Sequence, residues 1–189
     1  VGKWIIQNAF SMCTECRKYY PEFRVSINLS YVQILKSPLM MELKQMIDHS
    51  GISCSGIIVE LTESGYLEGT PAVRSVWNDM KQLRIQIALD DFGTGYSNLM
   101  NISNLEPDIV KLDRGFTLKA LSRSYEYQLM QYVIEMVHKL NQYVCVEGVE
   151  TKDDLEKIKA LGPDLIQGYY YSKPCSRDEF LKKFFDYSE

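Results

Sequence analysis

Two adjacent carboxylates, Asp90 and Asp91, stand at the end of an apolar segment in the sequence IQIALDDFGTGYSNL. Burying one unpaired carboxylate is costly, and two neighbouring carboxylates also repel each other. A cation is therefore expected beside them. Gly93 and Gly95 follow directly and predict a mobile loop that lets Asp91 move toward that cation.

Other apolar segments also end on oxygen-bearing side chains. The candidate ligand set contains one amide, four carboxylates and no histidine or cysteine: Asn28, Glu60, Asp90, Asp91 and Glu147. Hard divalent cations, Mg²⁺ or Mn²⁺, prefer such ligands. Four carboxylates exceed what one ion needs, so two ions sharing a bridging carboxylate are expected, and such a pair suits in-line displacement at phosphorus. The alternative is that each acid pairs with a basic residue or faces solvent.

Lys111 has two chemical interpretations. It could form a Schiff base, as in barrel aldolases, or act as a fixed ammonium that orients water and phosphate. Nearby carboxylates stabilise a charged lysine, whereas a Schiff base requires a neutral amine, so the ammonium role is favoured. A lysine that merely ends a strand in solvent is the third alternative. The tyrosines at 169–171 could stack on a base or simply pack.

Short β-rich segments alternate with longer segments of helical periodicity, and these elements must position the polar residues. The predicted strands lie within residues 23–30, 56–64, 85–93, 108–114, 143–150 and 165–171. Helices are expected between them, including 126–141. The helix at 37–51 has Ser37 as a possible N-cap and Gly51 as its stop, and the helix at 151–162 has Thr151 as its cap and Gly162 as its stop.

Strict alternation of strand and helix predicts an α/β fold with a parallel sheet. Each predicted strand becomes polar near its carboxyl end, where a (β/α) barrel builds its active site, whereas an open sheet uses one crevice. We therefore expect one domain, residues 1–189, with a TIM-like barrel fold. A complete barrel has about eight strands. Since six are visible, the chain is expected to be N-terminally truncated, with the first strands upstream of Val1.

Composition excludes several classes of protein. A formal net charge of -4 argues against binding duplex nucleic acid. The sequence contains neither a signal-peptide pattern nor an apolar segment long enough for a membrane helix, which predicts a cytoplasmic domain. Cys13 and Cys16 form a C-x-x-C pair, but zinc would need two more ligands, and His49 and His138 are isolated. Free thiols in a reducing compartment are expected.

Six ordered motifs resemble a known family. They run from about Phe23 to Pro174 and read NLS, ELTES, DDFGTGYS, PDIVKLD, EGVET and QGYYYSKP. This sequence resembles the bacterial EAL-domain family of cyclic-di-GMP phosphodiesterases. The resemblance implies a TIM-like barrel that uses magnesium or manganese to open cyclic-di-GMP to linear pGpG.

The resemblance also assigns roles to individual residues. It implies metal ligands at Asn28, Glu60, Asp90, Asp91 and Glu147, with Asp90 bridging the ions. Lys111 falls on the lysine that contacts the attacking water, and Glu147 falls on a position also proposed as general base. Substrate contacts are expected from Gln167, Asp113 and Ser30, and a loop-stabilising role from Glu63 and Glu150.

The namesake Glu-Ala-Leu motif and its phosphate-binding arginine do not occur in the sequence, and we expect them upstream of Val1. Valine replaces the common alanine at position 146. The family also implies a homodimer and regulatory domains upstream in the parent protein. Two functions are compared: a metal-dependent phosphodiesterase and a catalytically silent receptor of cyclic-di-GMP. By itself the chain is expected to retain metal poorly and to hydrolyse little.

Overall fold

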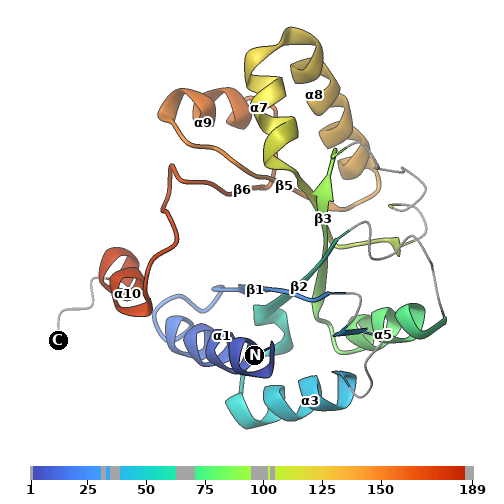
Figure 1. The fold of residues 1–189 in the computed structure, drawn as a ribbon, viewed down its shortest axis with the longest axis vertical. Coiled ribbons are helices and arrows are strands. Elements are labelled where there is room, and N and C mark those ends of the chain that lie inside the picture. The colour runs from blue at the N-terminus through green and yellow to red at the C-terminus, as the bar shows by residue number, and fades with distance from the viewer. Residues whose placement is uncertain are drawn as a thin grey trace. The chain divides into compact units, whose positions relative to one another are not determined.

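The computed structural model describes residues 2–30, 33–34, 39–62, 71–94, 102 and 105–185. Helices and strands mostly alternate along these residues, with β4 following β3 and α8 following α7 (Figure 1). The elements are α1 (Gly2–Cys16), β1 (Val25–Asn28), α3 (Leu39–Ser50), η1 (Cys54–Gly56), β2 (Ile57–Thr62), α5 (Pro71–Gln82), β3 (Gln86–Phe92), β4 (Ile109–Leu112), α7 (Arg114–Ser122), α8 (Ser124–Lys139), β5 (Tyr143–Val146), α9 (Lys152–Lys159), β6 (Leu165–Ile166) and α10 (Arg177–Phe185).

Each of the six predicted strand segments contains one observed strand. Within the described residues the strands follow chain order across the sheet, from β1 to β6. The register is parallel for β1 with β2, and for β4 with both β3 and β5, as it is for β5 with β6. Parallel pairing brings the carboxyl ends of neighbouring strands to the same edge, as the sequence predicts for this fold class.

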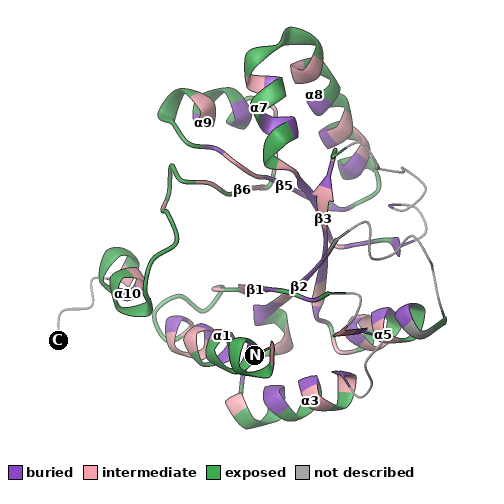
Figure 2. Cartoon of the chain, in the orientation of Figure 1, coloured by how far each residue is buried: buried purple, intermediate pink, exposed green. Residues whose placement is uncertain are grey.

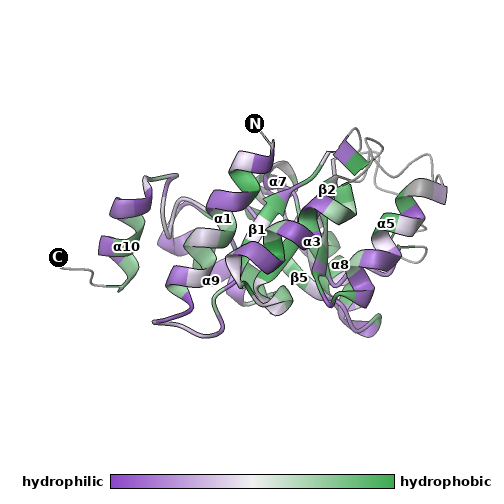
Figure 3. Ribbon diagram, turned by 90° about the horizontal axis from the view of Figure 1, so that it is seen from below, coloured by the Kyte–Doolittle hydropathy of each residue, from purple (hydrophilic) through white to green (hydrophobic). Residues whose placement is uncertain are grey.

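The chain divides into two compact units, of which the first comprises residues 1–61, 68–87 and 174–189. Helix α1 packs on both β1 and α3. It buries a stripe at helical spacing, made by Ile6, Phe10, Cys13 and Cys16. Apolar and hydrophilic residues alternate along α1, α3 and α5 (Figure 3), so each helix has one face suited to the core.

Aromatic contacts attach α10 within this first unit. The ring of Phe23 lies 6.0 Å from the rings of both Phe180 and Phe185. Arg177, the first residue of α10, forms an ion pair with Glu15 of α1. The C-terminal helix is therefore held by both apolar and ionic contacts, although no signal for this helix was identified in the sequence.

The second unit comprises residues 62–67 and 88–173. Every residue of β4 is buried, and α7 packs against both α8 and α9. Figure 2 shows buried residues along the strands and on one side of these helices, with exposed residues on the other side. The predicted cap of α9 is present: Thr151 and Asp154 form a capping box. Gly162 follows this helix at φ +75°.

The five cysteines are free, and Cys13 and Cys16 are buried. Burial raises the pKa of the Cys13 thiol, and it raises the pKa of Cys16 to about 11. Both thiols are therefore held in the neutral form. Among the described helices, none is both long enough and apolar enough to cross a membrane.

Candidate functional site

Three predicted site residues meet at the carboxyl ends of β3, β4 and β5. The ammonium Nζ of Lys111 lies 2.9 Å from Oδ1 of Asp90 and 2.6 Å from Oε1 of Glu147. The Lys111 side chain is only 6 % exposed, and the side chains of Asp90 and Glu147 are 13 % and 18 % exposed. We call these three residues the Lys111 cluster. Both carboxylates stabilise the positive charge of a buried lysine.

A β-bulge in β3 explains the two adjacent aspartates. Leu89 lies opposite Val110 and Phe92 lies opposite Leu112, so β3 contains one residue more than β4 over this interval. Asp91 takes up the extra residue at φ +61°, a conformation that aspartate tolerates better than most residues. A bulge re-aims side chains that would otherwise alternate across the sheet. Oδ1 of Asp90, beside the bulge, lies 2.9 Å from Nζ of Lys111, so this carboxylate pairs with a basic residue, which is one of the alternatives that the sequence left open.

The turn that follows β5, residues 147–150, is hydrogen-bonded to other parts of the chain at both ends. At one end the amide of Glu147 donates to the carbonyl of Leu112 over 3.1 Å. At the other end Arg114 donates to Oε1 of Glu150 from Nε at 3.2 Å and from Nη2 at 2.8 Å. This hydrogen bond raises the pKa of Arg114, which keeps the guanidinium charged. Glu150 therefore has an identified partner.

Arg114 is a site-associated residue that the sequence analysis missed. It is the first residue of α7, where a cation is unfavourably placed relative to the helix dipole. A basic residue at the beginning of a helix, directly after a polar strand end, was therefore a detectable signal that it has an acidic partner elsewhere.

Two predicted ligands belong to the first unit. Asn28 and Glu60 are paired in register across β1 and β2. Glu60 is buried and accepts a hydrogen bond from the hydroxyl of Ser26, while Asn28 is exposed. The carbonyl of Glu60 also accepts from the amide of Leu29 over 3.0 Å. The predicted ligands Asn28 and Glu60 thus lie opposite each other near the carboxyl ends of β1 and β2.

The predicted substrate contacts have local structural partners. Asp113 caps α7, since its Oδ1 accepts from the amide of Gly115 over 2.7 Å. The hydroxyl of Ser30 donates to the side-chain amide oxygen of Gln33 over 2.9 Å. Gln167 is exposed and follows β6 directly. Its backbone amide donates to the carbonyl of Val146 over 2.8 Å.

Some expectations concern residues that are not described. Glu63, Gly95 and the predicted cap Ser37 lie outside the described residues. The three tyrosines after β6 are exposed, and the rings of Tyr170 and Tyr171 meet edge to face at 5.3 Å.

No three histidine, cysteine, aspartate or glutamate side chains within the described ranges are grouped so that they could hold a metal ion. The predicted ligands are divided between the units, with Asn28 and Glu60 in the first and Asp90, Asp91 and Glu147 in the second. The chemistry of the donors nevertheless suits a hard cation, because every donor atom is oxygen.

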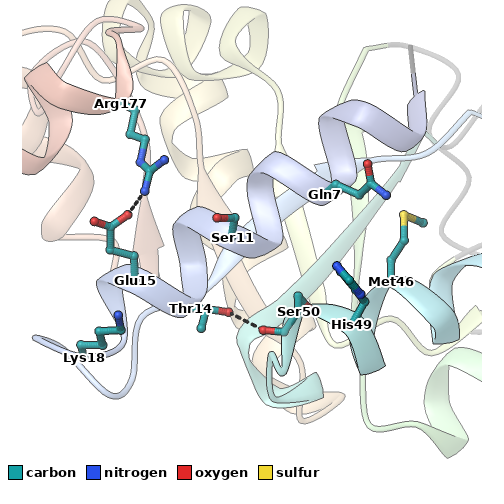
Figure 4. A pocket seen from close by; sticks show the side chains of 9 residues that line it. All are labelled: Gln7, Ser11, Thr14, Glu15, Lys18, Met46, His49, Ser50 and Arg177. Atoms are coloured by element: carbon teal, nitrogen blue, oxygen red, sulfur yellow. Dashed lines mark hydrogen bonds and ion pairs between the residues drawn. The ribbon is translucent and has the colours of Figure 1, made fainter.

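A cavity of about 530 Å³ lies in the helical layer of the first unit (Figure 4). Its walls come from α1, α3 and α10, and Arg177 and Glu15 point toward each other at one end. The lining residues are Gln7, Ser11, Thr14, Glu15, Lys18, Met46, His49, Ser50 and Arg177. None of the predicted site residues is among them, so this cavity is separate from the strand-end chemistry.

Comparison with known proteins identifies the family. The sequence matches the EAL domain over residues 1–174. It is 30% identical over 174 residues to the cyclic di-GMP phosphodiesterase PdeF of Escherichia coli K12. The aligned region covers 92% of this chain and 23% of PdeF. The chain therefore spans about a quarter of the length of this curated relative.

Solved structures confirm the fold class. The EAL enzyme Bd1971, in its form with cAMP and cyclic-di-GMP bound, matches with a TM-score of 0.91 at 28% identity, covering 96% of this chain and 50% of that chain. The PaMucR phosphodiesterase in complex with c-di-GMP matches with a TM-score of 0.87 at 25% identity, covering 95% and 73% of the respective chains. The expected α/β, TIM-like fold is thus confirmed, and the chain belongs to the EAL domain family.

Proposed function

We propose that this chain provides the catalytic domain of a cyclic-di-GMP phosphodiesterase, which hydrolyses the cyclic dinucleotide to linear pGpG. The observation that carries this proposal is the Lys111 cluster, a buried ammonium between two carboxylates at adjoining strand ends. Its support from family membership is strong, because the match spans residues 1–174 and PdeF is itself named as such an enzyme.

A pair of divalent cations, Mg²⁺ or Mn²⁺, is part of the proposal. We assign the ligands to Asn28, Glu60, Asp90, Asp91 and Glu147, with Asp90 shared by both ions. When bound, such ions would lower the pKa of a coordinated water and stabilise charge at phosphorus. The oxygen-only donors support this assignment.

Lys111 is assigned the role of a fixed ammonium that orients water and a phosphate oxygen. Its charge is stabilised by Asp90 and Glu147, and the buried stem leaves Nζ little freedom to move. A Schiff base would require a neutral, mobile amine, which this environment disfavours. Glu147 is assigned the role of general base, and Gln167, Asp113 and Ser30 are assigned to the substrate.

The test is release of pGpG from cyclic-di-GMP by the purified chain and by its parent protein, at saturating Mg²⁺ or Mn²⁺. The product is measured by chromatography. Asp90→Asn should abolish turnover, because an amide does not bridge two cations as a carboxylate does. Asp153→Asn, an exposed change on α9, is the matched control and should leave turnover unchanged. Near-normal turnover by Asp90→Asn would refute the bridging role.

Two further measurements separate the alternatives. Calcium should bind without supporting turnover, since its larger radius and looser coordination disturb the metal spacing. Tight binding of cyclic-di-GMP by the intact parent, without any product, would instead identify the silent receptor. A homodimer, regulatory domains elsewhere in the parent and a cytoplasmic location remain predictions of the sequence.

A further inference from the structure

We propose that Arg114 is a positioning residue, which fixes the turn carrying Glu147 and thereby the ion pair between Glu147 and Lys111. This inference rests on the proposed function only in that Glu147 serves the reaction there. The placement of Glu147 is a structural property that is measurable without turnover.

The ion pair of Arg114 with Glu150 contributes more to the orientation of the turn than to the stability of the folded chain. The Arg114 side chain is 58 % exposed and that of Glu150 is 38 % exposed, and exposed ion pairs contribute little to stability. However, two guanidinium donors, Nε and Nη2, converge on one carboxylate oxygen. Two donors define the direction of the contact as well as its distance.

A second contact attaches the same arginine to the residue next to Glu147. Gly148 has φ +80°, and a Cβ atom placed there would lie 2.4 Å from Cγ and 2.9 Å from Cβ of Arg114. The methylene stem of Arg114 therefore packs directly against the backbone at position 148. Glycine is required at this position both by its backbone conformation and by this close approach.

These contacts hold the turn from the side of α7. Arg114 contacts Gly148 through its stem and Glu150 through its guanidinium, while the amide of Glu147 is bonded to Leu112. Arg114 and Leu112 flank the same short segment of chain at the end of β4. The turn is thus attached to the junction between β4 and α7 on one side, while on the other side the amide of Val149 donates to the carbonyl of Gln167 over 3.2 Å. In this proposal the attachment through Arg114 sets the 2.6 Å contact of Glu147 with Lys111.

The experiment compares Arg114→Met with Arg123→Met in the full chain. Arg123 is the matched control, because its exposed guanidinium lies 3.1 Å from Glu126 on the neighbouring helix α8, away from the turn. The chain is labelled with ¹³C at the glutamate side-chain carboxyls, and the resonance of Glu147 is assigned by its loss in Glu147→Gln. We expect Arg114→Met to shift and broaden this resonance, and Arg123→Met to leave it unchanged.

Turnover of cyclic-di-GMP by the parent protein, carrying the same substitutions, supplies the second readout. Arg114→Met should lower kcat by about 10- to 100-fold, the range typical of residues that orient a ligand or reacting group, with KM largely unchanged. If Arg114→Met does not fold, Glu150→Gln is measured instead, since it weakens the same contact and conserves size. It should shift the Glu147 resonance in the same direction.

The outcomes separate the two proposals. An unchanged Glu147 resonance in folded Arg114→Met or Glu150→Gln overturns the positioning role, whether or not the protein turns over substrate. An equal shift in Arg123→Met overturns it as well. A specific shift in the chain, together with a parent protein that never hydrolyses cyclic-di-GMP, supports the positioning role and counts against the proposed function.

Discussion

Replacing Lys111 by methionine tests the electrostatics of the candidate site directly. Methionine keeps an unbranched apolar stem but removes the ammonium that contacts both Asp90 and Glu147. The two carboxylates then lose a shared cation and repel each other more strongly. Lys111→Met should therefore destabilise the folded chain, although a methionine is more easily buried than a lysine.

The magnitude follows from burial. Breaking a buried ion pair costs about 3–5 kcal/mol. Because the carboxylates retain 13 % and 18 % exposure, the lower end of that range is expected, about 3 kcal/mol. For a chain of this length each kcal/mol lowers Tm by about 2–4 °C, so Tm should fall by about 6–12 °C.

The assay is urea unfolding followed by circular dichroism, with thermal unfolding in parallel. Lys3→Met is the matched control: Nζ of Lys3 lies 2.7 Å from Oε1 of Glu42, but its side chain is 66 % exposed. An exposed pair contributes about 0–1 kcal/mol. Lys111→Met should therefore lose several times more stability than this control, and adding Asp90→Asn should restore part of the loss.

A loss no larger than that of Lys3→Met would refute the reasoning, because the Lys111 cluster would then contribute no more than a surface pair. A double variant, Lys111→Met with Asp90→Asn, that is less stable than Lys111→Met alone would also contradict it. In that case repulsion between the remaining carboxylates would not be the cause of the loss.

Three further predictions concern other parts of the chain. Gly168→Ala should cost at least about 2 kcal/mol in urea unfolding, because its Cβ would lie 2.0 Å from the carbonyl oxygen of Val149; wild-type stability would contradict the observed packing. Cys16, with a pKa of about 11 against an ordinary 9.0, has a roughly 100-fold lower thiolate fraction, so a disulfide reagent should label exposed Cys175 well before it. Equal labelling rates in the folded chain would disprove this. Hydrogen bonds at the start of α10 lower the pKa of Glu179 below its ordinary 4.5, so its stabilising contribution is present above that pH and is lost as the pH falls through the folded value; Glu179→Gln should flatten this part of the acid-side profile of Tm.

The arrangement of elements could be predicted largely from local sequence. Apolar segments of strand length alternate with helical periodicity, and each of the six predicted segments contains a strand. Capping residues such as Thr151 and stop residues such as Gly162 act within one or two turns of chain, so their signals survive without tertiary information. The same local rule placed polar residues at the strand ends.

Helices were expected between the strands, but the ranges of α5 and α7 were not predicted individually, and α10 was not identified. Aromatic residues of α10 hold this helix in place, and Phe23, which contacts Phe180, lies more than 150 residues earlier in the chain. A contact at that separation has no periodicity by which it can be recognised. For Arg114 the sequence offers only a basic residue at the start of a helix, and its partner Glu150 belongs to a different strand end.

The sequence by itself determined which residue types reach the carboxyl ends of the strands, because parallel pairing and a period of two follow from short-range rules. Only the tertiary structure decided how those residues meet. The bulge in β3 breaks the strict alternation that the sequence suggests, and it brings Asp90 against Lys111 while Asp91 adopts a positive φ. Asp113, which directly follows β4, caps α7. Register between neighbouring strands depends on the balance of packing, backbone hydrogen bonds and buried charge over the whole sheet, so no window of local sequence specifies it.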